Sequence, residues 1–192
     1  SQDVSPYDVL HLARIEGGRL VIGDSFASVA LTGVASFSVA NDYNVQILVA
    51  GSDQDDTIIG VEDYNNRLYG GNGDDSLLGL DWSDTLDGGI GNDTLDGGGS
   101  FDNFYGGIGD DTIIFGGNGG YALGGDGADT FVFDPMNQIG YSSESEIDQF
   151  DPTVDTLVIK GWSLQDFENA ISSRDGEMVI SFETSTIILF RI

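Results

Sequence analysis

The sequence has no cysteine, a single histidine and very few cationic residues. Without cysteine there is no disulfide framework from which a redox compartment could be inferred. Only 6 Lys and Arg residues stand against 33 Asp and Glu residues, which gives a net charge of -27. This balance argues against nucleic acid and anionic membrane surfaces as partners, because both bind positively charged protein surfaces. The carboxylates repel one another unless cations neutralise them, so multivalent cations are the expected partners.

Long apolar runs and catalytic motifs are missing as well. No run approaches the roughly 18 apolar residues of a membrane-spanning helix, so no membrane span is expected. The opening segment SQDVSPYDVLHLAR has neither a basic leader nor an apolar signal core, and we expect the chain to be a piece of a longer protein. There is no H-E-x-x-H or G-x-S-x-G motif, and His11 is expected to be a surface or lining residue of a strand. We therefore predict no catalytic residue and no enzyme activity in this chain.

Glycine is abundant, and it recurs in a repeat of nine residues. Four complete copies share the pattern G-G-x-G-x-D-x-U-x, in which U is a large apolar residue; they are GGNGDDSLL (70–78), GGIGNDTLD (88–96), GGIGDDTII (106–114) and GGDGADTFV (124–132). Weaker copies begin at residues 51, 60, 79, 97 and 115, and the copy at 60 has ten residues. Turn-forming Gly and Asp alone would not keep this register. The pattern is that of a calcium-binding parallel β-helix repeat.

Each position of the repeat has a physical role. Glycines at positions one, two and four allow tight turns and a close approach of the backbone to an ion. The Asp at position six supplies a carboxylate oxygen, and turn carbonyls can complete a shell of six or more oxygens, which suits Ca²⁺ better than Mg²⁺. Position eight is expected to point inward and to form a core ladder of Ile58, Leu68, Leu77, Leu86, Leu95, Phe104, Ile113, Leu123 and Phe131.

Alternate copies should line opposite edges of the fold, because eighteen residues make one coil of two strands and two turns. We call the edge formed by the copies at 51, 70, 88, 106 and 124 the intact edge. Its predicted side-chain metal ligands are Asp56, Asp75, Asp93, Asp111 and Asp129. The degenerate edge, formed by the copies at 60, 79, 97 and 115, is expected to carry Asn66, Asp84, Asp102 and Tyr121 at position six, with Trp82 and Ser100 replacing the fourth glycine. A weaker metal site at Asp84 and Asp102 remains an alternative to ordinary turns.

These repeats resemble the repeats-in-toxin (RTX, haemolysin-type) family of haemolysins, serralysin-type proteases, secreted lipases and mannuronan epimerases. The resemblance implies an all-β, right-handed parallel β-roll (β-solenoid), folding driven by Ca²⁺ and export through a type I secretion apparatus. It also implies main-chain ligands at Gly71, Gly73, Gly89, Gly91, Gly107, Gly109, Gly125 and Gly127. The expected function is that of a secreted, extracellular accessory module that binds several calcium ions beside a covalently linked catalytic domain.

Charge and flanking segments extend this interpretation. Residues 51–134 contain eighteen acidic residues and one basic residue, so the metal-free array is expected to be largely unfolded and metal binding to drive folding. We predict three regions: an N-terminal β cap or domain remnant at 1–50, the calcium-binding roll at 51–133 and a C-terminal cap at 134–192. In that cap we expect strands at 147–150 and 155–159, a short helix opened by Ser163 and Asp166, and a hairpin turning at 174–177.

Two other functions are compatible with the sequence. Aromatic residues on the degenerate edge could form an adhesin or glycan-binding surface; these are Trp82, Phe101, Tyr105 and Tyr121. Position seven of the intact edge forms a regularly spaced hydroxyl ladder that could bind ice or another surface, and it consists of Thr57, Ser76, Thr94, Thr112 and Thr130.

Overall fold

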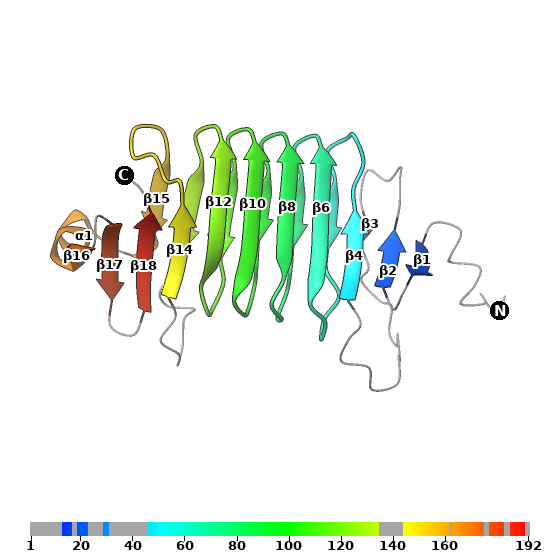
Figure 1. The fold of residues 1–192 in the computed structure, drawn as a ribbon, viewed down its shortest axis with the longest axis horizontal. Helices are drawn as coiled ribbons and strands as arrows, with labels where there is room; N and C mark the ends of the chain where they lie inside the picture. The colour runs from blue at the N-terminus through cyan, green and yellow to red at the C-terminus, as the bar shows by residue number, and fades with distance from the viewer. Residues whose placement is uncertain are drawn as a thin grey trace.

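The chain folds into a parallel β-roll of two sheets that enclose a continuous core (Figure 1). The computed structural model describes residues 13–16, 19–22, 29–30, 46–134, 144–161, 163–174, 177–182 and 185–190. His11 lies outside these residues. None of the described helices is long and apolar enough to cross a membrane.

The two sheets are built from alternate strands of the chain. The larger sheet contains, in spatial order, β1 (Ala13–Glu16), β2 (Arg19–Ile22), β4 (Gln46–Ala50), β6 (Asn66–Asn72), β8 (Thr85–Ile90), β10 (Asp102–Ile108), β12 (Gly120–Asp126), β14 (Glu144–Asp148), β18 (Ser185–Phe190), β17 (Glu177–Phe182) and β16 (Ile171–Arg174). The smaller sheet contains β15 (Thr156–Ile159), β13 (Thr130–Phe133), β11 (Thr112–Phe115), β9 (Thr94–Asp96), β7 (Ser76–Leu78), β5 (Thr57–Ile59) and β3 (Val29–Ala30). Figure 1 shows the strands of the larger sheet side by side along the long axis of the molecule.

Parallel pairing in the repeat region keeps equivalent residues of successive coils in register. Leu68 of β6 pairs with Leu86 of β8, and Leu86 pairs with Phe104 of β10. The predicted inward position is confirmed, because these side chains are fully buried; so are their counterparts on the smaller sheet, Ile58, Leu77, Leu95, Ile113 and Phe131. Each such side chain contributes about 1.5–3 kcal/mol on burial. Strands of three residues are not stable alone, so stacking between coils must hold them.

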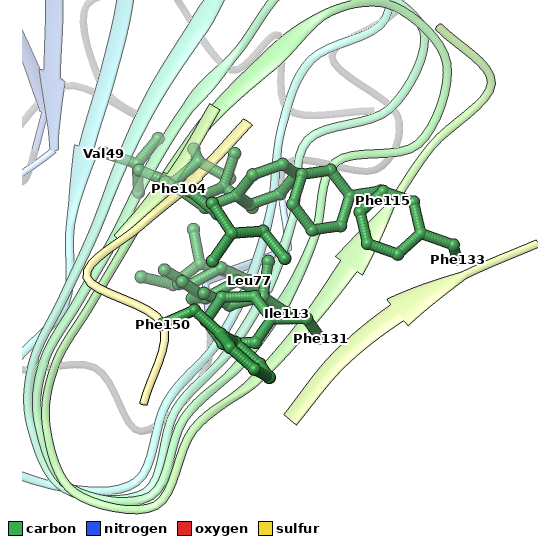
Figure 2. Close-up of a cluster of buried hydrophobic side chains, with 14 of the residues drawn as sticks. Val49, Leu77, Phe104, Ile113, Phe115, Phe131, Phe133 and Phe150 are labelled. Atoms are coloured by element: carbon green, nitrogen blue, oxygen red, sulfur yellow. The ribbon is translucent and has the colours of Figure 1, made fainter. Parts of the chain in front are cut away.

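The C-terminal half of the core contains a cluster of buried phenylalanine side chains (Figure 2). The rings of Phe115 and Phe133 stack with centroids 4.1 Å apart, and Phe104 meets Phe115 edge to face at 5.2 Å. Phe150, which follows β14, packs against Phe131. These side chains fill the space between the sheets at the coils of β10 to β15.

The copy at 115–123 corrects two expectations. Ala122, rather than Leu123, pairs with Phe104 and points into the core. Gly120, rather than Tyr121, pairs with Asp102, so Tyr121 is not at the sixth position. The reason is the strict alternation of β12, in which residue 121 and residue 123 both face outward. The small Ala122 suits a core that is already filled by Phe104 and Phe115 at that level.

In the C-terminal cap the predicted short helix and the strand at 155–159 are present, whereas the first strand lies at Glu144–Asp148 and not at 147–150. The strands β14 and β15 add a further rung to each sheet by pairing in parallel with β12 and β13. The helix α1 (Leu164–Ala170) begins with the predicted capping box, since Asp166 Oδ2 accepts hydrogen bonds from the backbone N–H of Ser163 at 2.8 Å and from its hydroxyl at 2.7 Å. The strands β16, β17 and β18 are antiparallel to one another, and β18 joins β14 in parallel. The turn residues 175–176 of the predicted hairpin lie outside the described residues.

Strands near the N-terminus continue both sheets below the first repeat. β1 and β2 are antiparallel, whereas β2 pairs in parallel with β4 and β4 with β6. β3 pairs in parallel with β5 on the smaller sheet. Val49 of β4 is fully buried and pairs with Leu68, so it belongs to the core ladder of the larger sheet.

Candidate metal sites along the two edges of the roll

The turns of the intact edge depend on glycine at positions two and four. All eight glycines predicted as main-chain ligands have φ between 106° and 143°, a region that L-residues with a Cβ rarely occupy. Their backbones also approach one another closely. A Cβ on Gly89 would collide with the carbonyl oxygen of Gly71 one coil earlier, and a Cβ on Gly91 would collide with that of Gly73. The turns therefore stack with their main-chain carbonyl groups in a tight column.

The first glycine of each copy has a separate role, which is to make room for the carboxylate. A Cβ on Gly88 would collide with the side chain of Asp93, and a Cβ on Gly70 would collide with Asp75 Oδ2. The same added atom on Gly70 would lie 2.5 Å from the carbonyl oxygen of Gly88 in the next coil. Carboxylate and carbonyl oxygens thus converge on the first glycine. The repeat pattern alone does not indicate that the carbonyl groups at this position belong to the site.

The sixth-position Asp residues form a buried row along the intact edge. Each of Asp56, Asp75, Asp93, Asp111 and Asp129 is at most 2% exposed. In each step of the row, one Oδ1 atom accepts a hydrogen bond from the backbone N–H of the Asp one coil earlier. The N–H of Asp75 donates to Asp93 at 2.7 Å, and that of Asp93 donates to Asp111 at 2.7 Å. One oxygen of each carboxylate therefore holds the coils in register.

The second carboxylate oxygen is left for another ligand. Within the described part of the chain, Oδ2 of Asp75, Asp93 and Asp111 is buried and has no hydrogen-bond donor. A buried carboxylate oxygen without a partner is costly, because burial removes it from water. Either a proton or a cation must compensate for it. The neighbouring carbonyl oxygens favour a cation, since hard oxygen donors are the ligands of Ca²⁺.

Burial shifts the titration of these carboxyl groups upward. Desolvation is the main cause, and it raises the pKa of Asp75 to about 6 and that of Asp111 to about 7, with neighbouring carboxylates adding to the effect. The pKa values of Asp93 and Asp129 are raised for the same first reason. Backbone hydrogen bonds oppose the shift but do not cancel it. Without a cation, the ionised form of these carboxyl groups is therefore disfavoured.

The degenerate edge also has a row of buried sixth-position Asp side chains, although its turns lack the fourth-position glycine. Asp84 and Asp102 are buried, and the N–H of Asp84 donates to Asp102 Oδ1 at 2.8 Å. In both residues the buried Oδ2 has no donor among the described residues. Desolvation raises the pKa of Asp84 to about 7 and that of Asp102 to about 8. The geometry therefore brings the weaker candidate residues into the same kind of site as those of the intact edge.

Both ends of the intact row are closed by side-chain hydrogen bonds. At the first coil, Asp56 Oδ2 accepts from the N–H of Ser52 at 2.6 Å and from its hydroxyl at 2.9 Å. At the last coil, Asp155 Oδ1 accepts from the N–H of Asp129 at 3.0 Å, and its Oδ2 accepts from the N–H of Asp151 at 2.8 Å. Asp155 extends the row from a segment outside the repeats, for which only a strand was predicted.

A second ladder, at position five, was also missed. Asp74 donates its N–H to Asp55 Oδ1 at 2.9 Å, Asn92 donates to Asp74 at 2.7 Å, and Asp110 donates to Asn92 at 2.8 Å. These side chains are on the exposed side of the turns. The recurrence of Asp or Asn at position five is the sequence signal for this ladder.

The donor set fits calcium if main-chain oxygens complete it. The described residues contain no group of three or more His, Cys, Asp or Glu side chains that could hold a metal ion. No more than two of these side chains can therefore contact the same metal ion. Carbonyl oxygens of the glycine turns are the remaining donors, and they converge on the first glycine beside the carboxylate. An oxygen-only donor set of this kind suits Ca²⁺.

Fold and site together define a parallel β-roll whose glycine turns carry buried rows of carboxylates. Residues 51–120 of this roll match the RTX calcium-binding nonapeptide repeat, with four copies of that family model at residues 51–86, 61–95, 79–113 and 87–120. The chain thus carries a calcium-binding module of a type that occurs in secreted proteins, and the repeat region itself is non-catalytic.

Comparison with solved structures finds a distant likeness to the extracellular lipase LipA from Serratia marcescens. The match has 16% sequence identity and a TM-score of 0.29, and it covers 75% of this chain. This chain spans only 37% of the length of that lipase chain. No curated protein sequence matches the chain significantly.

Proposed function

We propose that this module folds when calcium binds outside the cell, after type I export, and that it stabilises a covalently linked catalytic domain. The observation that carries the proposal is the set of buried Oδ2 atoms without a donor on both edges of the roll. On the intact edge, Asp75, Asp93, Asp111 and Asp129 supply the side-chain oxygens. Asp56 extends this row, and Asp84 and Asp102 form a second row.

Main-chain oxygens complete the proposed sites. The first glycine of the next coil places its carbonyl oxygen beside the carboxylate, and the glycines at positions two and four stack their carbonyl groups in columns along the same edge. A bound cation supplies the positive charge that the buried row lacks. The chain's own part is to hold the oxygens in register, which the Oδ1 hydrogen bonds between coils achieve.

Charge repulsion makes folding depend on the cation. Carboxylates at the same position of neighbouring coils lie about 5 Å apart, the spacing of adjacent strands. Because residues 51–134 contain only Arg67 as a basic residue, this charge has no internal counterion along the rows. The free energy of calcium binding then becomes free energy of folding. Sites with affinities of about 10⁻⁴–10⁻³ M, as in extracellular modules, would stay empty in the cytosol and fill outside.

Far-UV circular dichroism during a calcium titration of EDTA-treated protein tests the proposal. We expect a cooperative gain of β signal with Ca²⁺, and little or none with Mg²⁺ in a parallel titration. A chain that is fully folded in EDTA and unchanged by calcium would contradict calcium-driven folding.

A second candidate function, glycan binding, is favoured by one observation. Trp82, Phe101 and Tyr105 are 49%, 43% and 37% exposed, and Tyr105 lies against Tyr121 with ring centroids 6.3 Å apart. Exposed aromatic rings are suited to stacking on sugar rings. Quenching or enhancement of Trp82 fluorescence by oligosaccharides, abolished by Trp82→Ala, would support this function; an unchanged spectrum with a panel of glycans would contradict it.

A further inference from the structure

Asn66 occupies the place in the degenerate row where the next two coils have Asp84 and Asp102. It begins β6, it is 1% exposed, and its backbone N–H donates to Asp84 Oδ1 at 2.6 Å, as the N–H of Asp84 donates to Asp102. The ladder therefore runs unchanged through Asn66. Only the chemistry of the side chain differs, because an amide replaces the carboxylate.

Four oxygen atoms surround the side-chain nitrogen of Asn66. Nδ2 lies 2.9 Å from Asp84 Oδ1, 3.0 Å from the carbonyl oxygen of Tyr64, 3.1 Å from that of Gly79 and 3.3 Å from that of Val61. A primary amide has only two hydrogens, so four acceptors exceed what it can satisfy with full hydrogen bonds. The amide orientation is fixed by its surroundings, since Oδ1 accepts from the N–H of Val61 at 2.8 Å. One carboxylate oxygen and three carbonyl oxygens around a single donor nitrogen resemble the oxygen shell of a cation.

The next coil shows what is present at the equivalent place when the residue is Asp. A Cβ on Gly60 would lie 2.7 Å from Asn66 Nδ2 and 2.6 Å from the carbonyl oxygen of Gly79. A Cβ on Gly79 would lie 2.5 Å from Asp84 Oδ2 and 2.8 Å from the carbonyl oxygen of Gly97. Asn66 Nδ2 thus corresponds to Asp84 Oδ2. In the Asn66 coil a donor faces the glycine carbonyl oxygen, whereas in the Asp84 coil a carboxylate oxygen, which is itself an acceptor, faces it.

We propose that the side-chain amide of Asn66 takes the place of a cation, so that the first coil of the degenerate edge closes without calcium. The inference rests on the proposed function, because it assumes that the carboxylate coils bind calcium. Asn66 is then the residue that sets where the row of cation sites begins on this edge. The extra residue of the ten-residue copy belongs to the same turn, which contributes the carbonyl groups of Val61 and Tyr64.

Two substitutions test the inference: one replaces the amide of Asn66 by a carboxylate, and the other replaces the carboxylate of Asp84 by an amide. Asn66→Asp should add one bound Ca²⁺ per chain, measured by equilibrium dialysis with circular dichroism to verify folding. Asn103→Asp is the matched control, because this half-buried residue on the outer side of β10 receives the same change without the surrounding oxygens, and the calcium count should not change. Asp84→Asn should remove one ion and leave the chain folded in calcium, with the new amide facing the carbonyl group of Gly97.

The outcomes separate this inference from the proposed function. A wild-type chain that binds no calcium would overturn both. Calcium binding by the wild type with an unchanged count in folded Asn66→Asp would overturn this inference alone. If Asn66→Asp does not fold in saturating calcium, Asp84→Asn decides: one ion fewer in a folded chain supports the inference, and an unchanged count or an unfolded chain overturns it.

Discussion

The two edges of the roll differ in their turns far more than in their side-chain rows. On the intact edge, positions two and four are glycines with positive φ in every complete copy. On the degenerate edge, position two is Leu80 with φ 86° in one copy and Gly98 with φ 85° in the next, and position four is Trp82 or Ser100. Yet Asp84 and Asp102 are as deeply buried as Asp75 and Asp93, and they make the same hydrogen bonds between coils.

This difference separates two requirements that the repeat normally combines. The glycines satisfy the backbone geometry of the turn, and the carboxylates satisfy the register of the coils. A buried carboxylate oxygen without a donor is present on both edges, so it depends on the Asp residue and not on the glycines of the turn. Loss of the glycine pattern is therefore a poor guide to loss of the row.

The largest effect is expected from single replacements in the middle of each row. Asp93→Ala removes a proposed ligand and leaves the buried N–H of Asp75 without its acceptor. An unsatisfied buried donor costs about 1–3 kcal/mol, so we expect the calcium concentration at the folding midpoint to rise about tenfold or more. Asp102→Ala should act in the same direction through the N–H of Asp84.

Circular dichroism in calcium titrations measures both shifts. Asp126→Ala is the control for loss of one negative charge on the intact edge, because Asp126 is exposed, and its midpoint should not rise. If Asp102→Ala behaved like Asp126→Ala, the degenerate row would be mere turn structure, and the likeness between the edges would fail.

The pH dependence of the metal-free protein should be the next largest effect. The folded-state pKa values of about 6 for Asp75, about 7 for Asp84 and Asp111 and about 8 for Asp102 lie above the usual value of 3.8, so the folded chain binds more protons than the unfolded chain across this window. Stability in EDTA is then greatest at low pH and is lost as the pH rises through about 6 to 8. Calcium must displace these protons, so its affinity should fall on acidification.

Thermal unfolding in EDTA at pH 5, 6, 7 and 8 tests whether the melting temperature falls as the pH rises. Asp102→Asn should flatten the change between pH 7 and pH 8, because Asp102 has the highest pKa of the row. A melting temperature that rises with pH in EDTA would contradict the account of desolvated carboxyl groups.

The smallest effect concerns the strained turn of the degenerate edge. Leu80 has positive φ, which costs a residue with a Cβ about 1–2 kcal/mol. Leu80→Gly should therefore be more stable than Leu80→Ala by about 1 kcal/mol. At Leu78, in the strand β7 of the same coil, the order should reverse, because glycine weakens a strand. Denaturant unfolding in saturating calcium measures both pairs, and equal signs at the two positions would refute the assignment of strain to Leu80.

Much of the roll could be predicted because the repeat fixes the register. A constant spacing of eighteen residues places equivalent residues on neighbouring strands, so the burial of Leu77 and Leu95 and the row through Asp75 and Asp93 followed directly. The prediction failed where it departed from this spacing, since Ala122, and not Leu123, lies eighteen residues after Phe104. In the copy at 115–123 the alternation of β12, rather than the apolar size of Leu123, decides which residue points inward.

Other parts of the site have no repeat signal. Asp155 joins the row 26 residues after Asp129, from a segment without the glycine pattern. The role of Asn66 depends on carbonyl groups from its own turn and from the next coil, and residue type alone does not reveal that convergence. These contacts are set by tertiary packing, which sequence periodicity does not describe.

Anomalous diffraction from crystals grown in calcium tests the central claim most directly, because it locates each ion relative to the two rows. The account predicts peaks beside Oδ2 of Asp75, Asp93 and Asp111 on the intact edge and of Asp84 and Asp102 on the degenerate edge, and none beside Asn66. Ions found only at the exposed ladder of Asp55, Asp74 and Asp110, with none beside the buried oxygens, would contradict it.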